Sequence, residues 1–228
     1  MTAKRTSAVF IVTVILFTIV MASVYADDAG KLIDKVFGQD LEGLRTLIAE
    51  GINVNAQDSS SGSTALILAC SYGFEEIARL LLSSGANPNI QANNGVTALM
   101  AAAQASREIV ELLLKYGADI HLRANDGTTA FTNSISGVIG GRVQTRVPEL
   151  LLEKGSDVNE AISTGRAEGY TPLMMAANNN ALDLAEFLIG RGANVNARAK
   201  DGATALSLAI EENHQEMVKL LRARGAKE

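Results

Sequence analysis

The side chains that most often carry out catalysis or bind metals are few in this chain of 228 residues. There are two histidines, His121 and His214, which lie far apart in the sequence, and one cysteine, Cys70. A single cysteine cannot form an intramolecular disulfide or a cysteine-cluster metal site. The chain also lacks a glycine-rich motif of the kind that binds phosphate. We therefore expect no metal, no other cofactor and no enzymatic activity.

Each of these three residues has a structural interpretation. His121 and His214 lie beside predicted turns, where a polar side chain bonds the backbone or faces solvent. Cys70 lies in an apolar helical stretch, where a free cysteine packs as a small buried residue. A redox-active or partner-linking thiol is the alternative for Cys70.

The composition excludes one class of partner and favours one kind of core. The formal net charge is −5 and both signs are scattered, whereas nucleic-acid binding needs concentrated Lys and Arg. Hydrophobic residues make up 47% of the chain but aromatic residues only 4%. A core of Ala, Leu, Ile and Val without aromatic bulk favours closely stacked helices.

The N-terminus has the order of an export signal. Lys4 and Arg5 precede an apolar run from Ala8 to Val24, and Val24-Tyr25-Ala26 then offers a cleavage site before two aspartates. Residues 1–26 are therefore predicted to be a signal peptide, which places the rest of the chain in the periplasm or outside the cell. An uncleaved anchor that faces the periplasm is the alternative, although 17 residues fall short of the about 20 that span a bilayer. The membrane would be contacted through this segment alone.

The remaining chain repeats itself with a period near 33 residues. Five triplets similar to Thr-Ala-Leu begin at Thr64, Thr97, Thr129, Thr171 and Thr204. Each is followed by a Leu-rich run and then a glycine, in order Gly85, Gly117, Gly155, Gly192 and Gly225, and Gly51 precedes the series. The threonines can cap a first helix, the Leu runs can bury a second helix, and the glycines can end it in a left-handed conformation.

This pattern resembles the ankyrin repeat over about residues 29 to 228. The resemblance implies an all-α solenoid of about six helix-turn-helix units with β-turn fingers, preceded by the signal peptide. The predicted units are a degenerate N-terminal capping repeat, three repeats, a repeat with a long finger and a C-terminal capping repeat, at 27–58, 59–91, 92–124, 125–162, 163–198 and 199–228. The family's His after the Leu is replaced in all five units that carry the threonine triplet, so we expect a family brace between repeats to be missing.

The fourth unit departs from the regular spacing. About five extra residues lie between its two predicted helices, and Pro148 is expected in the first turn of a shortened second helix. The finger that follows is also long. Surface insertions of this kind often carry function.

The resemblance implies that partners bind a concave face made by the fingers and first helices. The matching positions are Ser63, Tyr72, Val96, Gln104, Thr128, Arg166, Tyr170, Asn178, Asn179 and Glu211. Tyr72 and Tyr170 are candidate interface anchors, because rigid aromatic side chains dominate interface energetics. The alternative is that both rings pack on adjacent fingers.

Three functions remain open at this point. The first is an exported, monomeric, non-enzymatic scaffold that binds another protein, similar to bacterial periplasmic ankyrin proteins that support envelope enzymes or stress resistance. The second is an inhibitor or immunity-type protein that occludes a toxin or an enzyme. The third is an enzyme with a site in the insertions of the fourth repeat, which offer Arg142, Arg146, Glu160, Arg166 and Glu168.

Overall fold

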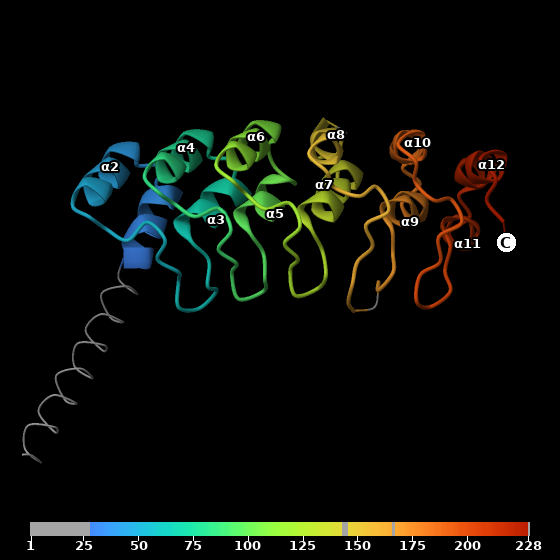
Figure 1. The fold of residues 1–228 in the computed structure, drawn as a ribbon, viewed down its shortest axis with the longest axis horizontal. Helices are drawn as coiled ribbons and strands as arrows, with labels where there is room; N and C mark the ends of the chain where they lie inside the picture. The colour runs from blue at the N-terminus through green and yellow to red at the C-terminus, as the bar shows by residue number, and fades with distance from the viewer. Residues whose placement is uncertain (1–27, 143–145, 166, 228) are drawn as a thin grey trace, which may run out of the picture.

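The computed structural model describes residues 28–142, 146–165 and 167–227, and it shows a row of helix pairs with long loops on one side (Figure 1). The predicted signal peptide, residues 1–26, lies outside the described residues. Within them no helix is long and apolar enough to cross a membrane.

Each of the six predicted units contains one pair of helices. In the first unit, residues 28–37 form a helix that is followed by α2 (Leu41–Ala49). The other pairs are α3 (Ala65–Ser71) and α4 (Glu75–Ser83), α5 (Ala98–Ala102) and α6 (Arg107–Lys115), α7 (Ala130–Ile139) and α8 (Arg146–Glu153), α9 (Pro172–Asn178) and α10 (Leu182–Gly190), and α11 (Ala205–Glu211) and α12 (Gln215–Ala223). The even-numbered helices form an outer row above the fingers (Figure 1).

The recurrent threonines begin the first helices, as the sequence predicts. In all five, the hydroxyl oxygen accepts a hydrogen bond from the backbone amide three residues later, which satisfies a donor that the helix leaves unpaired. The bond from Ser207 N to Thr204 Oγ1 measures 3.0 Å. Pro172 occupies the first turn of α9, where its missing amide is not needed. The side chains that replace the family's His partly restore local bonding, since Thr129 N donates to Thr132 Oγ1 at 2.8 Å.

The finger backbones lie so close together that glycine is required where they meet. A Cβ added at Gly95 would lie 2.6 Å from Asn125 N, and one at Gly127 would lie 2.6 Å from Ser163 N. A backbone bond from Asn125 N to Asn94 O at 2.9 Å joins the first of these finger pairs, and the Thr164 hydroxyl donates to Asn125 O at 3.2 Å in the second. The fingers therefore form one continuous array along the stack.

The Leu series forms the core between units. Leu81, Leu113, Leu151, Leu188 and Leu221 occupy the same register position in successive units, and each is fully buried. Cys70 is also fully buried, and burial raises the pKa of its thiol well above its ordinary value. The interpretation of Cys70 as a buried hydrophobic residue is confirmed.

The fourth unit accommodates its extra residues partly by lengthening its first helix. α7 has ten residues, whereas the other first helices from α3 onward have five or seven. Pro148 lies in the first turn of α8, as predicted. The long finger closes on itself, because Ile162 N donates to Tyr170 O at 3.0 Å and Gly169 N donates to Ile162 O at 2.8 Å.

Replacement of Leu113 by Ala should lower the free energy of unfolding by about 2–5 kcal/mol, because it opens a cavity between stacked units. Denaturant titration followed by circular dichroism measures this change. Lys115→Ala, on the exposed side of the same helix, should leave the unfolding midpoint unchanged. A Leu113→Ala variant as stable as the parent would contradict the core assignment.

The Cys70 thiol should resist alkylation in the native protein and react when the chain is unfolded, since both access and thiolate formation are blocked by burial. Mass spectrometry after timed exposure to iodoacetamide, with and without denaturant, measures the difference. Rapid native labelling would place Cys70 at the surface.

Candidate functional site

The first helices and the fingers enclose a hollow at the middle of the stack, which we call the central hollow. Its volume is about 720 Å³, within the usual range of binding pockets. It is lined by Ser71, Val96, Met100, Ala101, Gln104, Ala105, Asp126, Thr128, Asn133 and Arg142. Three of the predicted positions, Val96, Gln104 and Thr128, thus come together on one surface.

Local hydrogen bonds fix the two finger residues of the central hollow. The backbone amide of Val96 donates to Asn94 Oδ1 at 3.1 Å. Both the amide and the hydroxyl of Thr128 donate to Asp126 Oδ1, at 3.0 and 2.7 Å. Each of these residues also directly precedes a capping threonine. The hydrogen bonds and the cap together hold its backbone in one conformation in the free protein.

The insertion of the fourth unit adds a cation to the central hollow. Arg142 Nη1 donates to Gln104 Oε1 at 3.3 Å, which joins the third and fourth units across the hollow. The sequence analysis considered Arg142 for catalysis and did not include it among the binding positions. The extra length of the fourth unit was the only sequence signal for this contact. The inserted residues follow α7, and Arg142 among them reaches Gln104 at the end of the preceding unit's first helix.

An exposed aromatic cluster lies near the N-terminal end. The Tyr72 side chain is 58% exposed and Phe37 is 52% exposed. Their ring centroids lie 5.4 Å apart in an edge-to-face arrangement, and Tyr72 stacks on Phe74 at 5.7 Å. Tyr72 is therefore supported by its neighbours and still accessible, as an interface anchor requires. The sequence analysis missed Phe37, whose helix belongs to the degenerate first unit.

Ser63, the other predicted residue of the second unit, is half-buried and works through its backbone. Its carbonyl oxygen accepts a bond from Asp58 N at 2.9 Å, which closes the finger. Hydrogen bonds from the Ser60 and Ser61 hydroxyls lower the pKa of Asp58 to about 2. The tip of this finger is thus held by a carboxylate that stays ionised.

Tyr170 lies with two carboxylates at the C-terminal end. Its ring is half-buried against the core, and Asp201 on the next finger lies close enough to influence it. Burial raises the pKa of Tyr170 above its ordinary value, and the nearby charges of Asp201 and Glu211 add to this increase. Tyr170 is thus half-buried near a carboxylate of the adjacent finger, whereas Glu211 is exposed.

The remaining predicted positions are less clustered. Asn178 is half-buried at the end of α9, and Asn179 is exposed with its side-chain amide donating to Met175 O at 2.9 Å. Arg166 lies outside the described residues.

The residues considered for catalysis have structural contacts. Glu160 accepts bonds from Arg123 Nη2 at 3.0 Å and from Thr129 Oγ1 at 2.9 Å, so it joins two fingers. Glu168 pairs with Lys200 at 2.7 Å. Across the parts of the chain that the structure describes, no group of three or more His, Cys, Asp or Glu side chains could hold a metal ion.

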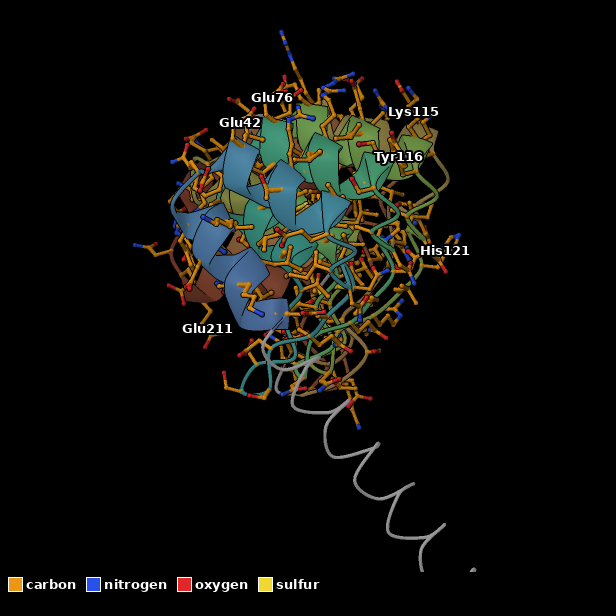
Figure 2. The ribbon with its side chains drawn as sticks, turned by 90° about the vertical axis from the view of Figure 1, so that its left-hand side faces the viewer. Glu42, Glu76, Lys115, Tyr116, His121 and Glu211 are labelled. Atoms are coloured by element: carbon orange, nitrogen blue, oxygen red, sulfur yellow. The ribbon has the colours of Figure 1, made fainter. Side chains whose placement is uncertain are left out.

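The two histidines also have different surroundings. His214 Nδ1 lies 3.1 Å from Ala177 O, which joins the last unit to the one before it. His121 is exposed and lies on the side of the stack opposite Glu211 (Figure 2).

Known proteins show the same repeats. Human ankyrin repeat and KH domain-containing protein 1 is 39% identical over 149 residues, which cover 65% of this chain and 4% of the relative. Caenorhabditis elegans protein glp-1 is 31% identical over 186 residues, which cover 79% of this chain and 14% of the relative. An ankyrin repeat-containing protein of Treponema pallidum is 44% identical over 62 residues, which cover 27% of this chain and 20% of the relative.

This chain therefore spans a fifth or less of the length of these relatives, and the similarity concerns the repeats. The profile described as ankyrin repeats in three copies matches residues 32–124 and 138–228. Together with the helix pairs, capping threonines and paired fingers, this match shows that the chain belongs to the ankyrin repeat family.

Proposed function

We propose that this protein is an exported scaffold that binds another protein through its concave face and has no enzymatic activity of its own. The observation that carries the proposal is a preformed surface, in which the central hollow and the supported Tyr72 ring are available without rearrangement. Pre-organisation reduces the entropy that binding would otherwise cost. Ankyrin repeats suggest an interaction scaffold in general, and we propose this surface as the place where the partner binds.

Several features support a protein as the partner. The central hollow is open and mixes apolar side chains such as Val96 and Met100 with the polar Gln104 and Arg142. This mixture resembles an interface more than a small-molecule site, because interfaces combine an apolar centre with aromatic residues and Arg. The net charge of −5 argues against nucleic acid.

Export rests on the N-terminal segment. The positive start, the apolar run and the Val24-Tyr25-Ala26 sequence follow the order of a signal peptide. The protein would then act in the periplasm or outside the cell as a monomer, where it could support an envelope enzyme or stress resistance.

The human 2-5A-dependent ribonuclease, which is 41% identical over 71 residues that cover 10% of it, combines such repeats with an enzyme in one chain.

Replacement of Tyr72 by Ala should weaken binding of the native partner by more than about 1 kcal/mol, because an exposed aromatic anchor would be lost. Proximity labelling in the native host identifies the partner, and calorimetry with the purified pair measures the affinity. Gln104→Ala tests the central hollow in the same way, and Lys115→Ala on the opposite side is the matched control. If both concave variants bind as tightly as the parent while deletion of residues 163–169 abolishes binding, the long finger is the contact and the concave-face proposal is wrong.

The mature protein should begin at Asp27, since cleavage is expected after Ala26. Mass spectrometry of the N-terminal peptide from the envelope fraction measures this. An intact chain recovered from membranes would favour the anchor, and recovery in the cytosol would contradict export altogether.

A further inference from the structure

Asparagines tie neighbouring units together on the outer side of the fingers. Asn89 is one example: its side-chain Nδ2 donates to Gly117 O at 3.0 Å, and its Oδ1 accepts from Asp119 N at 2.8 Å. Gly117 and Asp119 both belong to the loop after the second helix, so one asparagine makes two bonds to a single loop. We call this pair of bonds the Asn staple.

The Asn staple recurs at four of the five junctions between units. The asparagines are Asn55, Asn89, Asn159 and Asn196, and their partners are the equivalent glycine carbonyl and backbone amide. The junction between the third and fourth units is different, because His121 occupies the position of the asparagine.

Histidine cannot reproduce this geometry. An amide presents a donor and an acceptor side by side, whereas the two imidazole nitrogens lie at separate positions of a rigid ring. Among the described residues, no side-chain bond joins His121 to Gly155 or Asp157, and only its backbone amide donates, to Asp119 Oδ1 at 2.8 Å. The hydroxyl of Ser156, between those two residues, is buried without a hydrogen-bond partner. The loop of the fourth unit is therefore unstapled.

A second hollow lies at the same junction, which we call the outer hollow. Its volume is about 610 Å³ and it is lined by residues of α6, α8 and the loop that contains His121. Leu114, Ile120 and Leu150 contribute apolar surface to it, and Lys115 and Lys154 also line it. This hollow is open to solvent, so side chains do not fill the space between the outer edges of the third and fourth units. Lys115 and His121 both lie on the side away from Glu211 (Figure 2).

The finger side of this junction is firmly bonded. Arg123 donates to Ala161 O at 3.1 Å and to Glu160 Oε1 at 3.0 Å, and Asn125 N donates to Asn94 O at 2.9 Å. One side of the junction is thus cross-linked while the outer side lacks its staple and contains a hollow. An interface held along one edge can rotate about that edge.

We propose that the junction between the third and fourth units is a built-in hinge, at which the stack bends more readily than at the stapled junction before it. The bonded fingers form the pivot, and the outer helices α6 and α8 move apart. The central hollow spans the same junction, since Gln104 belongs to the third unit and Thr128 to the fourth. Bending therefore changes the width of the concave face. The hinge goes beyond the proposed binding role and stands without it.

Replacement of His121 by Asn should install the missing staple. The backbone amide hydrogen of Asp157 should then exchange with solvent about tenfold more slowly. Each hydrogen bond of this kind lowers the population of the open, exchangeable state by a factor of several. Hydrogen exchange of the full-length chain measures this, and the equivalent Asp119 amide should already be protected. Asn89→His is the mirror variant and should accelerate exchange at Asp119. Unchanged exchange at Asp157 in the His121→Asn variant would overturn the proposal.

Distances between spin labels test the motion itself. One pair, Lys115→Cys with Lys154→Cys, crosses the hinge, and the matched pair, Ser83→Cys with Tyr116→Cys, crosses the stapled junction before it at equivalent positions. The buried Cys70 should remain unlabelled in both. We expect a broader distance distribution for the first pair, which narrows to that of the second when His121→Asn is added. Equal widths in the parent, or no narrowing with His121→Asn, would show that this junction is not a hinge.

Discussion

A helix of five to ten residues cannot bury an apolar face by itself, and this constraint governs the whole molecule. Each unit depends on its neighbours for a core, which is why fully buried leucines recur at one register position. The stack is stable only while adjacent units stay in contact. The capping threonines, the finger glycines and the asparagine bonds all serve to hold that contact at a fixed spacing.

The regular part of this arrangement is readable in the sequence because it depends on local geometry. A threonine at the start of a helix and a glycine in a left-handed turn act within a few residues, so their period reveals the units directly. Burial of Cys70 follows from the same register. The recurring asparagines were visible as well, but their partners lie about 30 residues away, and the sequence pattern alone did not reveal their role.

The binding surface was less predictable for the same reason. Val96, Gln104 and Thr128 meet as the repeat register implies, whereas Arg142 joins them through an insertion whose path has no counterpart in the other units. Phe37 supports Tyr72 from a degenerate unit that lacks the threonine signal. Tyr170 was a candidate anchor of the concave face, yet its ring is half-buried beside the charge of Asp201 on the next finger. Contacts between irregular units depend on three-dimensional packing, which no periodic pattern encodes.

The continuous array of fingers has a mechanical consequence. Backbone bonds join the fingers of the second and third, the third and fourth, and the fifth and sixth units, and the bond from the Thr164 hydroxyl to Asn125 O joins the fourth and fifth. A load applied to the two ends would therefore pass through each junction in turn, and the extension would be the sum of many small displacements. When elements are loaded in series, the most compliant element limits the stiffness of the whole. A single residue that loosens one junction can therefore determine how far the whole stack extends under load.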